Sequence, residues 1–326
     1  MTNNERLTVE NVVSTGPFLL SIVVAAYNHE DFISDCLYSI LECRRIEDVE
    51  IIIIDDGSSD KTVSVVEELL SRFDVNFRVF TKPNSGLTDS LAIGLQRAAG
   101  KYVSFMASDD AYFPYGLDAC LEKLSVLSAT DVAILFQGEF FGSATGPVYN
   151  QETSHLFMLS KPEFLKAISL EYPKPMLLQS TVFGVEFLRS INPWSDRLGL
   201  DDWPTFIRVA QRVAMGVGSF TYDPSITICR YRFHKHGIHA NLDRQLKVCL
   251  EVVDKVVDPA FRAESRANVY IDRSLNYLSK GRVGISLKLL WRGGRGNPTI
   301  GTIFRAPRLV IRKLSRRLVR LYSAQR

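Results

Sequence analysis

The chain has 326 residues, of which 46% are hydrophobic, and a formal net charge of +3. This composition predicts one large or two modest globular domains. The five cysteines show neither CxxC pairs nor metal-binding spacing, the N-terminus has no apolar signal-peptide region, and no uncharged apolar run approaches the roughly 20 residues of a membrane-spanning helix. We therefore expect a cytoplasmic protein with reduced thiols.

Four apolar runs in the first third of the chain predict buried strands over residues 19–25, 49–54, 77–81 and 102–106. Apolar residues recur at helical spacing between these runs. Asn28 is a candidate cap for the first helix, Ser59 or Asp60 for the second, and Gly100 a candidate left-handed stop for the third. Strands that alternate with helices through short connections predict an α/β fold, with a mostly parallel central sheet and helices on both faces.

Polar residues follow three of these strands. They are Tyr27-Asn28, Asp55-Asp56 and Asp109-Asp110. The carboxyl ends of parallel strands gather along one edge of a sheet, where open α/β sheets bind their ligands. The sequence has no GxGxxG after the first strand and no GxxxxGK[ST], which argues against a Rossmann dinucleotide site and a P-loop.

The pair Asp109-Asp110 needs a physical reason, because neighbouring carboxylates repel. A divalent cation supplies one, since Mg²⁺ and Mn²⁺ prefer oxygen ligands. The alternative is that Asp110 caps the helix that Pro114 introduces. Both interpretations stay open on the residues alone.

The second half of the chain carries fewer signals. Residues 131–150 predict further strand and loop, and residues 161–169 a short helix. Asp201 and Asp202 precede apolar residues at helical spacing, so they are either site residues or helix caps. Residues 226–233 predict a strand that ends at His234, with His236 and His239 in a solvated loop behind it.

Five segments together resemble the family 2 glycosyltransferases with the Rossmann-like glycosyltransferase A fold. They are SIVVAAYNHEDFISDCLYSIL, VEIIIIDDGSSDKT, PNSGLTDSLAIGLQRAAGKYVSFMASDD, LGLDDWPTFIRVA and YRFH, which occur in the family's order over residues 19–240. The resemblance implies an inverting transfer from a nucleotide-sugar donor, most simply a UDP-sugar, with a divalent metal, Mn²⁺ or Mg²⁺. The chain has no Gln-x-x-Arg-Trp sequence of the processive synthases, which favours the addition of a single sugar.

The resemblance also assigns site residues. Ala25 and Tyr27 resemble the edge that packs on the nucleobase. Asp56 resembles the acceptor of a hydrogen bond from the base, with Asp55 as its structural partner. Asp109 resembles the ribose or metal contact, Asp110 the metal ligand and Asp202 the catalytic base. His234 resembles a contact to the donor phosphate or the metal. The family usually has Glu-Asp where this chain has Asp201-Asp202.

The C-terminal segment lies outside the resemblance. No acidic residue follows Asp272, and residues 281–326 carry twelve Lys and Arg, so the preceding residues carry a net charge of −9. Residues 302–322 predict a helix with an apolar stripe and a basic face, which is typical of a helix on an anionic membrane surface. The alternative is a helix that packs on its own domain with a solvated basic face.

We accordingly predict a flexible segment over residues 1–16, a catalytic domain over 17–245 and a basic, helical C-terminal extension over 246–326. Within the catalytic domain, 17–112 is the expected nucleotide-binding half and 113–245 the acceptor half. The expected function is glycosyl transfer to a glycan or lipid-linked glycan in bacterial surface polysaccharide synthesis, at the inner face of the cell membrane. Transfer to a lipid phosphate by the same fold is one alternative. A nucleic-acid-binding protein is another, although nucleic acid is not the expected partner, because the acidic body would repel it.

Overall fold

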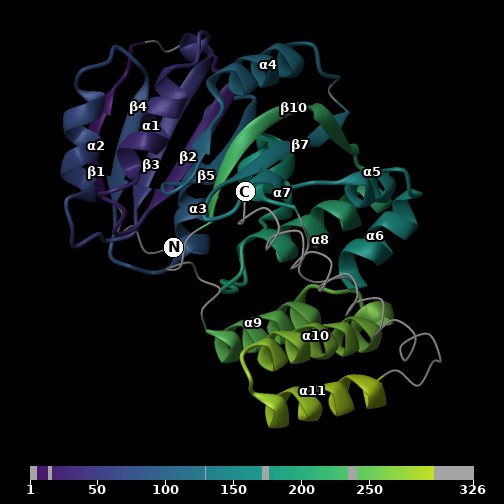
Figure 1. The fold of residues 1–326 in the computed structure, drawn as a ribbon. Coiled ribbons are helices and arrows are strands. Elements are labelled where there is room, and N and C mark those ends of the chain that lie inside the picture. Colours follow the sequence, from purple (N-terminus) through teal and green to yellow (C-terminus); the bar gives the residue numbers. More distant parts are fainter. Residues whose placement is uncertain (1–5, 14–16, 129, 171–175, 234–240, 297–326) are drawn as a thin grey trace.

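The computed structural model describes residues 6–13, 17–128, 130–170, 176–233 and 241–296, and Figure 1 shows their arrangement. The strands in these ranges are β1 Arg6–Asn11, β2 Leu20–Ala26, β3 Val49–Asp55, β4 Phe77–Thr81, β5 Tyr102–Ala107, β6 Ala111–Tyr112, β7 Asp131–Gly142, β8 Gly146–Pro147, β9 Thr181–Gly184 and β10 Ser219–Phe233. The α-helices are α1 Ile33–Leu41, α2 Thr62–Leu70, α3 Leu87–Arg97, α4 Pro114–Ser125, α5 Gln151–Phe157, α6 Lys161–Leu170, α7 Val185–Ile191, α8 Asp202–Ala214, α9 Leu242–Lys255, α10 Pro259–Ser279 and α11 Val283–Gly296. Two 3₁₀ turns, η1 Ile46–Asp48 and η2 Leu178–Ser180, complete the elements.

One sheet runs through the molecule in the order β1-β4-β3-β2-β5-β9-β7-β10-β6, with β8 paired to β7. Strands β4, β3, β2 and β5 are parallel neighbours, as their apolar runs predict. Beyond β5 the sheet is mixed, because β9 pairs antiparallel with both β5 and β7, whereas β7 and β10 are parallel. The predicted α/β class is confirmed, and the four predicted strands lie within one or two residues of their expected bounds.

Helices cover both faces of this sheet (Figure 1). Alternate residues of β2 point to opposite sides, so that Ile22 and Val24 pack with α1, α2 and α4, whereas Val23 and Ala25 pack with α3, α7 and α8. Helices α9 and α10 add Cys249, Val252 and Val269 to this second core. The predicted boundary at residue 246 therefore falls inside α9, whose apolar face continues the core of the sheet.

Three local predictions are corrected by the structure. Residues 6–11, inside the predicted flexible segment 1–16, form β1, which pairs antiparallel with the edge strand β4. Asn28 does not cap α1: it adopts a left-handed conformation with φ of 52°, and its side chain accepts a hydrogen bond from Ser59 N at 2.8 Å. Gly100 is not a left-handed stop, since its φ is not positive. It is glycine because its Cα lies against Ser21.

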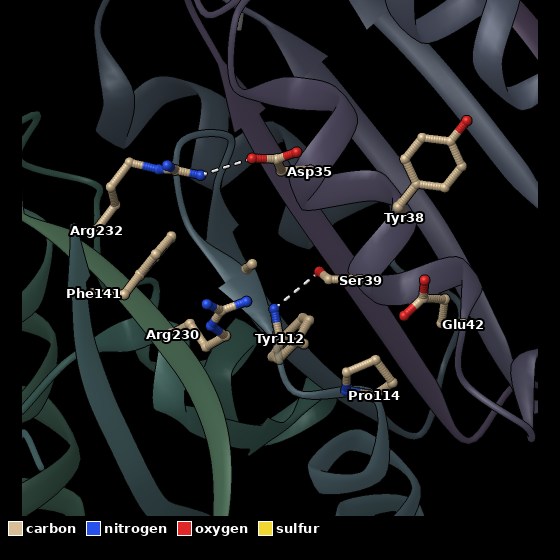
Figure 2. A pocket seen from close by; sticks show the side chains of 10 residues that line it. Asp35, Tyr38, Ser39, Glu42, Tyr112, Pro114, Phe141, Arg230 and Arg232 are labelled. Carbon is tan, nitrogen blue, oxygen red and sulfur yellow. Dashed lines mark hydrogen bonds and ion pairs between the residues drawn. The ribbon is translucent and has the colours of Figure 1, made fainter. Parts of the chain in front are cut away.

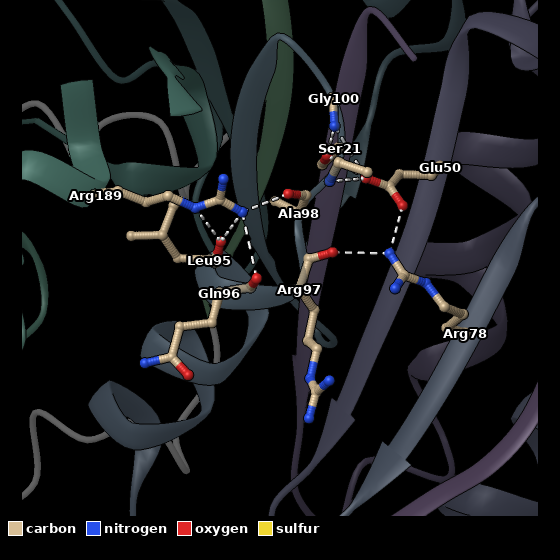
Figure 3. Close-up of polar contacts among 10 residues, drawn as sticks. Ser21, Glu50, Arg78, Leu95, Gln96, Arg97, Ala98, Gly100 and Arg189 are labelled. Carbon is tan, nitrogen blue, oxygen red and sulfur yellow. Dashed lines mark hydrogen bonds and ion pairs between the residues drawn. The ribbon is translucent and has the colours of Figure 1, made fainter. Parts of the chain in front are cut away.

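The amino ends of β2, β3 and β4 are joined by a polar network around Glu50 (Figure 3). The buried Glu50 carboxylate accepts hydrogen bonds from Ser21 Oγ at 2.5 Å, Arg78 at 2.6 Å and Gly100 N at 3.1 Å. Nearby, Arg189 of α7 donates to carbonyls in the last turn of α3 and just beyond it, including that of Leu95. This edge of the sheet is therefore saturated with internal hydrogen bonds, and the polar residues available for chemistry lie at the other edge.

The approach of Gly100 to Ser21 yields a stability prediction. A Cβ at position 100 would lie 2.7 Å from Ser21 N and 2.8 Å from Ser21 Oγ, so the backbone must shift. We expect Gly100→Ala to lower the free energy of unfolding by about 1–3 kcal/mol in urea denaturation. Gly284→Ala is the matched control, because it lies in a helix with nothing within 4 Å of its added Cβ. There, alanine's higher helix propensity predicts a gain of up to about 1 kcal/mol. Equal denaturation midpoints for the two variants would contradict the prediction.

Candidate active site

The loop after β3 is built around Asp55. Its Oδ2 accepts hydrogen bonds from Gly57 N at 3.1 Å and Ser58 N at 3.0 Å, which shape the tight turn. Asp55 is 3% exposed, and its other oxygen, Oδ1, has no hydrogen-bond partner within the described ranges. A buried carboxylate oxygen without a donor is costly, so this atom marks a place where a ligand or an ion would be stabilising.

Asp56 joins this loop to the turn after β4. Its carboxylate pairs with the buried Lys82 ammonium and accepts hydrogen bonds from Ser85 N at 2.8 Å and Gly86 N at 2.9 Å. The two loops touch at Gly57, where a Cβ would lie 2.9 Å from Asn84 N. Lys82 has no distinctive sequence signal and was not predicted. The hydrogen bond predicted from a nucleobase to Asp56 stays a prediction, and a carboxylate oxygen with two lone pairs can accept more than one bond.

The end of β2 supplies an aromatic ring beside these acids. Ala25 is 9% exposed and continues the core, whereas Tyr27 is 46% exposed. Asn28 N donates to Ser58 Oγ at 2.9 Å, which fixes the backbone next to Tyr27 against the Asp55 loop. A flat, exposed ring on a fixed backbone is suited to stack on a planar ligand.

Asp110 lies at the centre of the candidate site and is 2% exposed. Its Oδ1 accepts a hydrogen bond from Arg232 N at 2.7 Å, and its Oδ2 accepts one from Gln179 Nε2 at 3.1 Å. Burial and the neighbouring Asp109 charge raise the pKa of Asp110 well above its ordinary value. The helix-cap alternative is wrong, because α4 starts after Phe113 and its first turn receives no side-chain cap.

Arg232 is the functional candidate that the sequence did not single out. Its Nε donates to the Asp109 carbonyl at 2.7 Å, and one terminal nitrogen donates to Asp35 at 3.1 Å. The guanidinium also stacks near the rings of Phe32 and Phe141, 5.0 and 4.3 Å from their centroids. Its position two residues before His234, in YRFH, is the only signal that could have indicated it.

Arg232 also lines a cavity of about 310 Å³ between α1, β6 and β10 (Figure 2). Arg230 lies on the same side of β10, with its guanidinium 4.7 Å from the Phe141 ring centroid. Tyr112 forms part of the wall, and its backbone N–H donates to Ser39 Oγ at 2.9 Å. Asp35, on α1, closes the cavity by its pair with Arg232. Arg232 therefore connects this cavity to the turn that carries Asp109 and Asp110.

The second acid pair lies at the start of α8. Asp201 occupies the N-cap position without a side-chain capping bond, and the half-buried Asp202 accepts a hydrogen bond from Trp203 N, the next residue. Burial, together with the Asp201 charge, raises the pKa of Asp202 to about 8. Asp201 provides no side-chain cap for α8, so that alternative is wrong for this residue, and the role of Asp202 as the base stays a prediction.

Tyr231 lies on β10, next to Arg232. The side chain is largely buried, and its pKa is raised first by burial and then by the charges of Asp110, Asp109, Asp202 and Asp201. Strand β10 pairs antiparallel with β6, the strand that follows Asp109 and Asp110 in the sequence.

The loop after β2 contacts the acid turn directly. His29 Nδ1 lies 2.7 Å from Ser108 Oγ, and Ser108 is fully buried just before Asp109. Three loops, those after β2, β3 and β5, are thus linked by side-chain bonds. The structure brings Tyr27, Asp55, Asp56, Asp109 and Asp110 to one sheet edge, as predicted from the parallel topology.

The donor chemistry of the acid turn fits a hard divalent cation. Mg²⁺ and Mn²⁺ are commonly held by one or two carboxylates together with substrate phosphates and water, and the Asp109-Asp110 pair offers such oxygens. Within the described residues, no three His, Cys, Asp or Glu side chains converge as a complete metal-binding group. His234, predicted to contact the phosphate or the metal, lies outside the described residues, as do His236 and His239.

Comparison with known proteins supports the predicted resemblance to family 2 glycosyltransferases. Residues 21–180 match the sequence model of the family described as Glycosyl transferase family 2. A relative in Bacillus subtilis, the uncharacterized glycosyltransferase EpsJ, is 37% identical over 92 residues, which are 28% of this chain. The match spans about a quarter of that relative, 26% of its length.

Two solved structures share the fold. The TarS fragment 1–349 of S. aureus, in complex with UDP-GlcNAc, has a TM-score of 0.56 at 13% identity over 86% of this chain and 93% of its own. The mannosyltransferase PcManGT of Pyrobaculum calidifontis, in complex with GDP-Man and Mn²⁺, has a TM-score of 0.57 at 16% identity over 98% of this chain and 89% of its own. Likeness at these identities concerns the fold, and it confirms the expected glycosyltransferase A architecture.

The buried Lys82–Asp56 pair yields a prediction about the site's stability. Lys82 and Asp56 are 6% and 5% exposed. Removing one partner of a buried pair leaves an uncompensated charge, so we expect Lys82→Met to lower the free energy of unfolding by about 3 kcal/mol in urea denaturation. The control is Lys101→Met, because Lys101 is exposed and its ammonium lies over the Tyr102 ring, 5.0 Å from the centroid, instead of in a buried ion pair. Adding Asp56→Asn should recover part of the loss, and a Lys82→Met protein as stable as the control would contradict the prediction.

Proposed function

Residues 21–180 of this chain belong to glycosyltransferase family 2, and from that premise we propose that the protein transfers one sugar from a nucleotide diphosphate sugar to a glycan acceptor. The observation that carries the proposal is the buried Asp110, which follows Asp109 at the carboxyl end of β5 and accepts hydrogen bonds from Arg232 N and Gln179. This acid pair would supply an anionic cation site, and the second pair, Asp201-Asp202 at the start of α8, would supply a proton acceptor, both of which glycosyl transfer requires.

The donor is proposed to lie across the loops after β2 and β3. Tyr27 stacks on the nucleobase, Asp56 accepts a hydrogen bond from it, and Asp55 holds the turn. A uridine nucleotide is the simplest choice, since TarS was solved with UDP-GlcNAc, although PcManGT was solved with GDP-Man. The predicted contact of His234 with the donor phosphate completes this part of the site.

The diphosphate is proposed to bind at Asp109 and Asp110. A bound Mn²⁺ or Mg²⁺ would supply positive charge that stabilises the leaving diphosphate. Hydrogen bonds from Arg232 N and Gln179, one to each carboxylate oxygen, orient Asp110 for this role. Arg232 is a positioning residue in this arrangement, since its Nε donates to the Asp109 carbonyl and its backbone N–H donates to Asp110.

Asp202 is proposed to accept the proton of the attacking acceptor hydroxyl in an inverting displacement. Its raised pKa suits a base that works near neutral pH. The acceptor is proposed to be a bacterial surface glycan, lipid-linked and presented at the inner face of the cell membrane. Residues 281–326 would then contact the anionic membrane surface through their twelve basic residues. Across the described residues, no helix combines the length and apolar character that crossing a membrane requires.

Asp110→Ala tests the metal assignment. Loss of the carboxylate should abolish the Mn²⁺-dependent part of UDP binding, because the other predicted carboxylate, Asp109, remains alone. Isothermal titration calorimetry with and without Mn²⁺ measures this, and a thermal melt confirms that the variant is folded. Asp196→Ala, which removes a partly exposed acid that pairs with Arg208, is the control. Unchanged metal-dependent affinity in Asp110→Ala would sink the assignment.

Asp202→Asn tests the base. The change is nearly isosteric, so UDP-sugar affinity should be retained while turnover, measured as UDP release, falls at least about a hundredfold. With a pKa near 8, the carboxylate becomes the competent base as the pH rises, so kcat/KM of the parent protein should increase up to about pH 8. This pH dependence should vanish in Asp202→Asn. If Asp201→Asn proves the more damaging change, the base has been assigned to the wrong acid.

A further inference from the structure

Helix α11 packs on α10 by one narrow face. Ser286 and Leu289 are 1% and 3% exposed, and Leu289 packs with Tyr277 of α10 and Leu242 of α9. Gly293 continues the face, because a Cβ there would lie 3.0 Å from the Ile271 side chain and 3.1 Å from the Ala267 carbonyl. Figure 1 shows α11 as the outermost helix of the α9–α11 layer, on the side away from the sheet. The rest of its circumference therefore faces outward.

The outward arc carries three large apolar side chains in line. Val283, Leu287 and Trp291 are 50%, 60% and 58% exposed, and their spacing of four residues places them along one side of the helix. We call them the α11 stripe. Single exposed apolar residues are ordinary, whereas an aligned row that includes a tryptophan indicates a surface that meets something less polar than water.

Basic residues border the stripe on the same helix. Lys288 follows Leu287 and Arg292 follows Trp291, and no acidic residue occurs anywhere after Asp272. Arg282 precedes the helix but lies 3.7 Å from Asp243, so its charge is partly compensated. Lys288 and Arg292 have no acid in α11 to pair with, and their charge is available to an anionic surface.

We infer that α11 lies on an anionic lipid bilayer, with the α11 stripe inserted at the interface and Lys288 and Arg292 at the headgroups. This deepens the membrane contact of the proposed function, and it places that contact on a helix that belongs to the folded domain. Trp is favoured at the membrane–water interface, and each basic residue near an anionic surface contributes roughly 1 kcal/mol.

Other occupants fit this surface less well. A second copy meeting the same face by two-fold symmetry would oppose Lys288 and Arg292 to their own equivalents, which is repulsive. RNA would use the cations but would gain little from Val283 and Leu287, since phosphate contacts are electrostatic. A bilayer of anionic lipid matches both the apolar and the basic parts of the face.

The three tryptophans of the chain make the test specific. Trp194 and Trp203 are 4% and 0% exposed, so lipid quenchers and iodide reach Trp291 selectively. The full chain is mixed with vesicles of phosphatidylglycerol and phosphatidylcholine that contain brominated phosphatidylcholine. We expect quenching and a blue shift of the Trp291 emission with these vesicles. Vesicles of phosphatidylcholine and its brominated form, without phosphatidylglycerol, should cause little of either, and Trp291→Phe should show neither. Equal quenching by both vesicle types, or none, would overturn the inference.

Variants separate the stripe from its surroundings. Leu287→Ser should reduce partitioning into anionic vesicles about tenfold, which corresponds to about 1.4 kcal/mol, because the leucine side chain would be largely buried in the bilayer. Met215→Ser is the matched control, because Met215 is 74% exposed at the end of α8, outside the α11 stripe, and it should leave partitioning unchanged. Truncation after Gly296 should weaken partitioning by removing eight basic residues but should retain quenching of Trp291 by the brominated lipid.

The remaining outcomes each decide against the bilayer. If truncation after Gly296 makes Trp291 more accessible to iodide without lipid, residues of the chain's own tail cover the stripe. If sedimentation shows a dimer in which Trp291 is protected, a second copy is the partner, and protection by an RNA oligonucleotide but not by vesicles identifies nucleic acid. Mn²⁺-dependent UDP binding by Leu287→Ser should equal that of the parent, so loss of vesicle binding and failure of the proposed function are distinguishable.

Discussion

A buried carboxylate, that of Asp110, is the constraint on which the candidate site depends. A charge with 2% exposure is unstable unless donors surround it, and two separate parts of the chain provide them. Arg232 N comes from β10 and Gln179 from η2, so satisfying Asp110 also fixes the second half of the sheet against the first. The carboxylate proposed to bind a cation thus also joins β10 and η2 to the turn after β5.

The two edges of the sheet are organised in opposite ways. At the amino ends, Glu50 accepts hydrogen bonds from Ser21, Arg78 and the backbone of Gly100, so both carboxylate oxygens are used internally. At the carboxyl ends, Asp55 Oδ1 lacks a donor, and Tyr27 is nearly half exposed, within the described structure. The first arrangement holds the strands in register, and the second retains polar groups that a ligand can satisfy. This contrast points to the carboxyl edge as the functional one without reference to relatives.

Sequence patterns predicted the elements whose signals are local. The apolar runs of β2 to β5 and the acids at their ends follow from burial on both faces and from parallel topology. What depends on pairing across the fold was not predicted: β1 is an exposed edge strand with a polar sequence, and Gly100 is set by its distance to Ser21 rather than by its φ. Arg232 was missed for the same reason, because its partners Asp35 and Asp109 lie more than a hundred residues away.

Hydrogen bonds and packing connect the C-terminal helices to Asp202, the candidate base. Trp203, next to Asp202, donates its indole N–H to the Ile168 carbonyl of α6 at 2.9 Å, and Asn268 of α10 donates to the adjacent Leu170 carbonyl at 2.8 Å. Helix α10 in turn holds α11 through the close approach at Gly293. Because each step is a packed or hydrogen-bonded contact, a surface that binds α11 would fix the orientation of Asp202 as well. An enzyme held at a bilayer through α11 would therefore present its site to acceptors at that surface in one orientation.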